Sequence, residues 1–213
     1  MTSAPSPAPA PPRITAPRPG SVAPAVDHWG QALYYQKDGD FENALKHYTA
    51  LLEQEPMNAQ VRNNLGMLYL ERGRLDEAVR EFQRAINIDP RYARAHNNLG
   101  VALLAQKNTD GAAASFRAAL ELDRRNVDAI VNLAIADERL GQREHAKEGL
   151  LRALNIDPRN ALAHYNLGVL YDETGEAALA MQHYRSFLNH ASVEYARRAA
   201  DVRVRLNALA RVR

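Results

Sequence analysis

The chain has 213 residues, of which 46% are hydrophobic and 24% charged, and its formal net charge is +2. This balance is typical of chains that fold around a packed core, and it excludes a strong overall electrostatic attraction to nucleic acid or membranes. The chain has no cysteine, which excludes disulfides, thiol nucleophiles and cysteine-ligated metal sites.

Nothing in the sequence has the pattern of a membrane or export segment. No run approaches the ~18 consecutive apolar residues that a spanning helix needs. The N-terminus has no basic patch followed by an apolar stretch, as a secretory signal would. We therefore expect a cytoplasmic protein that does not insert into a membrane.

Residues 1–24 hold eight of the eleven prolines. Proline at this density removes helical hydrogen bonds and favours extended polyproline II backbone. We expect a disordered tail, which serves either as a docking segment or spacer, or only as a solubilising leader.

From residue 25 the sequence repeats with a period of 34 residues. Small residues recur at one position of each copy, and alanine recurs at another, twelve residues later. The small residues are Ala32, Gly66, Gly100, Ala134 and Gly168; the alanines are Ala44, Ala78, Ala112, Ala146 and Ala180. The copies, numbered repeats 1 to 5, are 25–58, 59–92, 93–126, 127–160 and 161–194.

Each repeat has the pattern of two antiparallel helices. An apolar stripe with helical spacing is followed near position 15 by glycine in four repeats, where a helix ends and the chain turns back. A second amphipathic stripe follows, and proline at position 32 of repeats 1, 2 and 4 prevents that helix from continuing.

This arrangement resembles the tetratricopeptide-repeat family, in which Leu, Gly and Tyr, then Ala, an aromatic residue and Pro recur at these spacings. The resemblance covers 25–194, and repeats 3 and 4 depart from it at Lys107, Arg124 and Asp137. It implies an all-α fold, a right-handed α-solenoid of five helical hairpins. We expect the arginine-rich segment 195–213 to form a capping helix over the last repeat.

No catalytic set or cofactor motif is present, so the sequence predicts neither enzymatic activity nor a cofactor. His28, His96 and His164 share position 4 of their repeats, too far apart along a solenoid to bind one metal ion. We interpret them as packing residues and extend that interpretation to His47 and His183, both at position 23.

The strongest functional pattern is asparagine at position 6 of four consecutive repeats. Position 6 points away from the stripe that packs the hairpin. In the resembled family this stripe lines the concave groove, and in superhelices of the O-GlcNAc-transferase type such amides hold the backbone of an extended peptide. The candidate groove residues are the position-6 amides Asn64, Asn98, Asn132 and Asn166, the neighbouring amides Asn63 and Asn97, the apolar residues Met67, Val101, Ile135 and Val169, and the acidic residues Glu138 and Asp172. The amides could equally fix the packing of adjacent helices.

These features predict a non-enzymatic scaffold that binds an extended segment of a protein partner, with no nucleic acid partner. Two alternatives stay open. One is a subunit that selects substrates for a separate enzyme such as a glycosyltransferase, and the other is a self-assembling homo-oligomer.

Overall fold

The computed structural model describes residues 27–211, and within that range it contains only helices and their connections. The expected tail 1–24 lies outside the described residues. The helices are α1 (His28–Asp38), α2 (Phe41–Gln54), α3 (Ala59–Glu71), α4 (Leu75–Ile88), α5 (Ala93–Ala105), α6 (Thr109–Leu122), α7 (Val127–Arg139), α8 (Arg143–Ile156), α9 (Ala161–Glu173), α10 (Ala177–His190), a 3-10 turn (Val193–Tyr195) and α11 (Ala196–Arg211). The all-α fold expected from the sequence is confirmed.

Each 34-residue repeat forms one antiparallel hairpin, and the sequence explains where its helices begin. Asn58, Asn126 and Asn160 occupy the last position of their repeats, and each side chain accepts a hydrogen bond from a backbone N–H of the next helix. This capping satisfies a donor that has no partner within the helix. Before repeat 3 the same position is Tyr92, which makes no such bond.

The turn inside each hairpin requires left-handed backbone. Gly39, Gly73, Gly141 and Gly175 have φ between 70° and 79°, a conformation that glycine adopts without steric cost. Repeat 3 has Lys107 at this point with φ 65°. The hairpin therefore keeps its turn without glycine, at a backbone cost that glycine would avoid.

Glycine has a second role inside three of the hairpins. A Cβ atom on Gly66 would lie 2.6 Å from the ring of Phe82, and one on Gly100 would lie 2.5 Å from the ring of Phe116. The missing side chain thus lets an aromatic ring of the second helix lie against the backbone of the first. Repeat 5 has the same arrangement with Gly168 and Tyr184.

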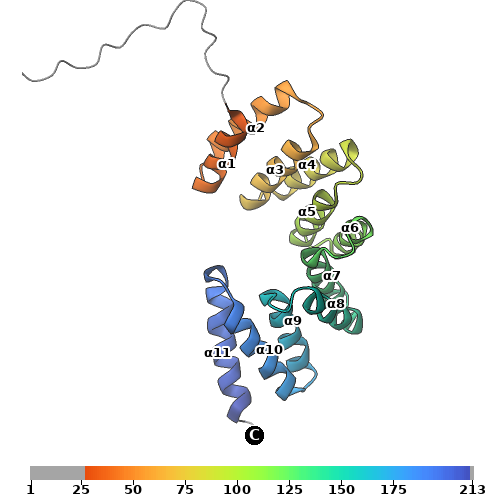
Figure 1. Ribbon diagram of the computed structural model, residues 1–213, viewed down its shortest axis with the longest axis vertical. Helices are drawn as coiled ribbons and strands as arrows, with labels where there is room; N and C mark the ends of the chain where they lie inside the picture. Colours follow the sequence, from red (N-terminus) through yellow and green to blue (C-terminus); the bar gives the residue numbers. More distant parts are fainter. Residues whose placement is uncertain (1–26, 212–213) are drawn as a thin grey trace, which may run out of the picture.

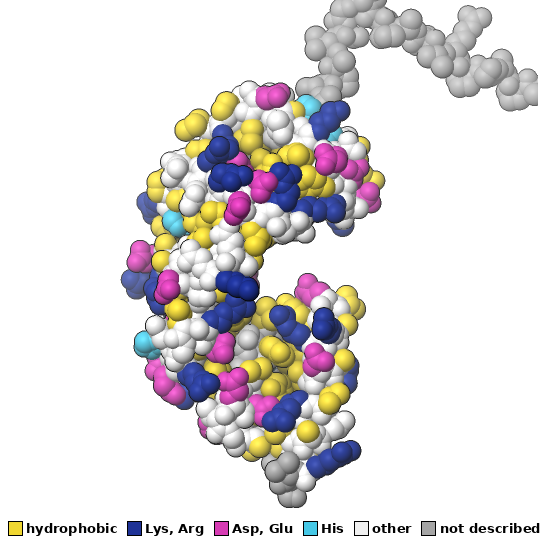
Figure 2. All heavy atoms as spheres, turned by 180° about the vertical axis from the view of Figure 1, so that it is seen from behind, with side chains coloured by type: hydrophobic (Ala, Val, Ile, Leu, Met, Phe, Trp, Pro, Cys, Tyr) yellow, Lys and Arg dark blue, Asp and Glu magenta, His cyan; other side chains and the backbone are white. Residues whose placement is uncertain are grey.

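The hairpins stack into an open arc (Figure 1). The first helices α3, α5, α7 and α9 each contact the next of that set, and they lie nearer the hollow of the arc than their partners do. Figure 2 shows this crescent from behind, hollowed between the N-terminal hairpins and the C-terminal end. Side chains on the inner side of the first helices therefore face a concave surface.

Helix α11 packs against α10 at the end of the arc. Its buried residues Ala199, Val202 and Leu209 share one apolar cluster with Tyr184 and Phe187 of α10. The Arg198 guanidinium lies 5.5 Å from the ring centroid of Tyr165 in α9. Helix α11 thus covers apolar surface that the last hairpin would otherwise expose.

Candidate peptide-binding groove

The structure places all twelve candidate residues on the inner helices. They are Asn63, Asn64 and Met67 on α3; Asn97, Asn98 and Val101 on α5; Asn132, Ile135 and Glu138 on α7; and Asn166, Val169 and Asp172 on α9. All are partly buried except Asn63, which is 1% exposed. The residues therefore form a row that crosses four repeats.

The amides are hydrogen-bonded between repeats rather than lying free. Asn98 Nδ2 donates to Oδ1 of Asn63 at 2.9 Å, and Asn132 Nδ2 donates to Oδ1 of Asn97 at 3.1 Å. Position 6 of one repeat thus binds position 5 of the repeat before it. We call these two bonds the amide staple. They give the amides a role in packing neighbouring hairpins.

The amide staple does not extend into repeat 5. Its position-5 partner would be Val131 of repeat 4, an apolar residue that is 2% exposed. Asn166 instead donates to the backbone oxygen of Leu162 in its own helix, at 2.8 Å. At the other end, Asn64 accepts a long bond of 3.4 Å from Asn63.

The carbonyl oxygens of the two donor amides, Asn98 and Asn132, remain available. Within residues 27–211, Oδ1 of Asn98 and of Asn132 accepts no protein hydrogen bond, and no buried side-chain nitrogen or oxygen lacks a partner. These two oxygens are therefore reachable by solvent. Each donor amide holds its N–H toward the preceding repeat and keeps its oxygen as an acceptor for another molecule.

The apolar candidates contribute to packing as well as to the surface. Met67 packs against the cluster of Phe82 and Ala102, and Val101 packs against that of Phe116 and Ala136. Ile135 and Val169 lie at the edges of the two C-terminal clusters. Since all four are partly exposed, they form a fixed apolar strip beside the amides.

The two acidic candidates at the C-terminal end of the row, Glu138 and Asp172, have different partners. Both carboxylate oxygens of Asp172 accept hydrogen bonds from Arg205 of α11, at 2.6 Å each, and one accepts from the Tyr184 hydroxyl at 3.2 Å. The Arg205 hydrogen bond is the main cause that lowers the pKa of Asp172. Asp172 therefore anchors α11, whereas Glu138 makes no ion pair within the described residues.

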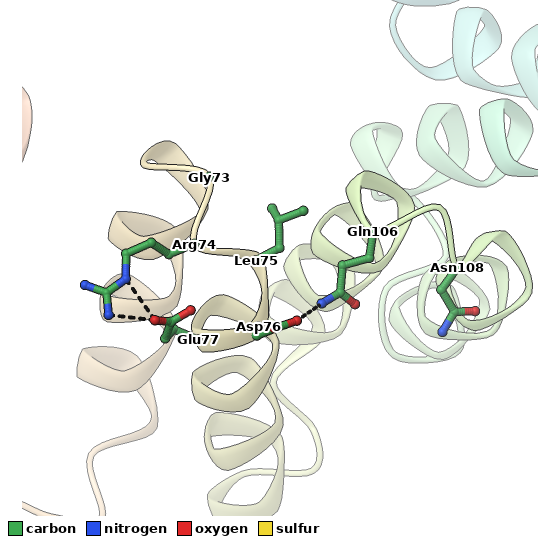
Figure 3. A pocket seen from close by; sticks show the side chains of 7 residues that line it. All are labelled: Gly73, Arg74, Leu75, Asp76, Glu77, Gln106 and Asn108. Atoms are coloured by element: carbon green, nitrogen blue, oxygen red, sulfur yellow. Dashed lines mark hydrogen bonds and ion pairs between the residues drawn. The ribbon is translucent and has the colours of Figure 1, made fainter.

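A crevice at the turn of repeat 2 is a different kind of surface (Figure 3). Arg74 binds Glu77 at 2.6 Å, and Gln106 donates to Asp76 at 2.6 Å, so the polar groups of the crevice largely bind one another.

In the described part of the chain no group of three His, Asp or Glu side chains is arranged to hold a metal ion. None of its helices is long and apolar enough to cross a membrane.

Sequence reasoning missed two pairs of facing imidazoles. His28 lies against His47, and His164 lies against His183, with Nδ1 atoms 2.9 Å and 3.0 Å apart. The residues of each pair are 19 positions apart, one on each helix of a hairpin. A comparison of equal repeat positions, 34 residues apart, does not bring them together.

Comparison with known proteins identifies the repeats. Models of the tetratricopeptide repeat match residues 47–80, 66–107, 93–126, 139–175 and 162–191. No curated protein sequence matches the chain.

Solved structures share the fold at low sequence identity. PilW, a type IV pilus biogenesis factor, has 21% identity and a TM-score of 0.72, over 85% of this chain and 91% of PilW. MamA has 23% identity and a TM-score of 0.66, over 75% and 93%. A thermophilic TPR protein of Thermus thermophilus has 19% identity and a TM-score of 0.68, over 86% and 97%.

Proposed function

Because this chain belongs to the tetratricopeptide-repeat family, we propose that it is a non-enzymatic scaffold that binds an extended segment of another protein along α3, α5, α7 and α9. The observation that carries the proposal is the pair of accessible amide oxygens on Asn98 and Asn132, held at one position of successive repeats.

The amide staple supports this function rather than competing with it. An amide that is already held by its N–H loses little side-chain entropy when its oxygen accepts a further bond. An extended peptide offers backbone N–H groups at regular intervals, and each needs an acceptor once it leaves water. Val101 and Ile135 follow these amides by three residues on the same helices, and their partly exposed side chains offer apolar contact to alternate side chains of such a segment.

The experiment selects unstructured peptides from a display library on the wild-type protein and then measures their affinity for variants. We expect Asn98→Ala combined with Asn132→Ala to weaken binding about 5- to 150-fold, since two hydrogen bonds contribute roughly 1–3 kcal/mol. The control is Asn87→Ala combined with Asn155→Ala, which removes two amides from the outer helices α4 and α8. It should leave the affinity unchanged.

The amide staple also contributes to stability, so affinity is measured at a temperature where circular dichroism shows each variant to be fully folded. Binding within twofold of wild type by the folded Asn98→Ala, Asn132→Ala variant would show that the amides serve packing alone. If the selected peptides compete with one another for the protein but bind this variant as tightly as wild type, their common binding surface lies elsewhere.

A further inference from the structure

Repeats 1 and 5 contain the same three-residue cluster at equivalent positions. In repeat 1 the rings of His28 and His47 have centroids 5.1 Å apart, and Tyr35 stacks on His47 with an interplanar angle of 10°. In repeat 5 the rings of His164 and His183 are 5.2 Å apart, and Tyr171 stacks on His183 at 19°. We call each facing pair of histidines an imidazole pair.

The fold does not require histidine at these two positions. Repeat 2 has Arg62 and Glu81 there, joined by an ion pair of 3.1 Å. Repeat 4 has Ile130 and Gly149. Since other residue pairs satisfy the same place in the hairpin, the two imidazole pairs need an explanation beyond packing.

The backbone next to repeat 5 orients one ring of its pair. His164 Nε2 lies 3.1 Å from the carbonyl oxygen of Pro158, so this nitrogen carries the proton that it donates. In the neutral ring Nδ1 then bears a lone pair, and it faces Nδ1 of His183. Burial lowers the pKa of both rings, which favours the neutral form. A histidine whose second nitrogen donates to a backbone carbonyl is the usual arrangement of a metal ligand.

The distances between the nitrogens match one coordination geometry. An ion about 2.0–2.1 Å from each nitrogen, the usual metal–imidazole distance, would subtend an angle of about 90° at these separations. That is the angle between neighbouring ligands in square-planar or tetragonal sites, the geometry of Cu²⁺ and Ni²⁺, whereas tetrahedral Zn²⁺ needs a wider one. Cu²⁺ also binds nitrogen ligands most tightly among these ions.

We propose that each imidazole pair chelates one Cu²⁺ ion through its two Nδ1 atoms, with water in the remaining positions. For such an ion each lone pair must point about 45° away from the line between the two nitrogens, and each ring turns until the two lone pairs converge there. In repeat 5 the ion replaces the hydrogen bond between the rings. The proton leaves Nδ1 of His183 for solvent and another is taken up at Nε2, so that the ring stays neutral and both Nδ1 lone pairs bind the ion.

The test is a titration of the full chain with Cu²⁺, followed by calorimetry and electron paramagnetic resonance. The matched variants place at these positions the residue types of Arg62 and Glu81 in repeat 2. They are His28→Arg with His47→Glu, and His164→Arg with His183→Glu. We expect each double substitution to remove one equivalent of Cu²⁺ and the fourfold variant to remove two. His145→Gln, which changes an exposed histidine of α8, should remove none.

The wild-type spectrum should show a tetragonal ion with hyperfine coupling to two nitrogens, and this signal should disappear in the fourfold variant. A folded fourfold variant that binds as much Cu²⁺ as wild type would overturn the proposal. So would a wild-type signal without two coupled nitrogens. If the exchanged pairs prevent folding, His47→Gln and His183→Gln are measured instead, with the same expected losses.

Discussion

Repeat 4 and the repeats on either side of it form the same hairpin with different chemistry. Repeats 3 and 5 place glycine against an aromatic ring, whereas repeat 4 places Ala134 against Leu150. At positions 4 and 23 of the repeat, repeat 2 has an ion pair and repeat 5 has an imidazole pair. Repeat 4 has Ile130 and Gly149 at these positions. Position 5 of repeat 4 is Val131, where repeats 2 and 3 have asparagine.

In repeat 4 the glycine and the aromatic ring are replaced together, by two residues whose sizes compensate. Leu150 on one helix of repeat 4 is smaller than the aromatic ring of repeats 3 and 5, and Ala134 on the other helix is larger than their glycine. Packing density is conserved when the total volume is kept, even though the individual side chains change. Repeat 1 is an exception, because it combines Ala32 with Tyr48, and both are fully buried.

The largest effect on stability is expected at the hydrogen bond between repeats 2 and 3, which has no counterpart between repeats 4 and 5. Asn98→Ala removes the partner of Asn63, which is 1% exposed, and should lower the free energy of unfolding by about 1–3 kcal/mol. Asn166→Ala should cost less, because Asn166 has Val131 at the partner position and bonds only within its own helix. Urea unfolding of both variants gives the comparison. Equal losses would mean that the amide staple adds nothing between repeats.

A second test transfers the packing pair of repeat 4 into repeat 3. Gly100→Ala places a Cβ atom 2.5 Å from the Phe116 ring, and we expect a net loss of about 1–2 kcal/mol after the gain in helix propensity. Adding Phe116→Leu should recover part of that loss, which a double-mutant cycle measures as a favourable coupling. If Gly100→Ala alone unfolds like wild type, repeat 3 adjusts as repeat 1 does.

A stabilising change is expected inside repeat 4. A Cβ atom on Gly149 would lie 3.4 Å from Cβ of Ala134, an ordinary contact. Gly149→Ala should therefore raise the free energy of unfolding by about 0.5–1 kcal/mol through helix propensity. Chemical denaturation measures this gain beside the Gly100→Ala variant. A loss of stability in Gly149→Ala would show that the small residue is needed opposite Ala134.

The smallest effect concerns a carboxylate that only repeat 4 has at position 11. Burial raises the pKa of Asp137, although Arg117, at 3.2 Å, and His145 oppose this effect. Because the native pKa exceeds the unfolded value of 3.8, the native state binds more protons in the window above pH 3.8. The contribution of Asp137 to stability therefore falls as pH rises through that window.

Asp137→Asn removes this titration. We expect the variant to gain stability relative to wild type as the pH rises from the unfolded pKa toward neutrality, which paired urea titrations at acidic and neutral pH measure. A relative loss at neutral pH would mean that the ion pair with Arg117 outweighs the cost of burying the charge.

The sequence was sufficient to predict the hairpins because their determinants are local. The 34-residue register places Gly73 at its turn and Asn58 at its cap, and each acts within a few residues. The bond from Asn98 to Asn63 depends instead on how far one hairpin is displaced against the next, which no residue pattern specifies. The same holds for Arg205, whose contact with Asp172 requires the angle at which α11 crosses the last repeat.

The amide staple also determines which new joints would carry a hydrogen bond between repeats if the array were lengthened by duplication. A second copy of repeat 3 inserted after the first would present Asn97 to a following Asn98, which is the donor–acceptor order of the existing joints. A second copy of repeat 4 would present Val131 to Asn132, and that new joint would have no such hydrogen bond. Growth of this protein by internal duplication is therefore easier through its third repeat than through its fourth.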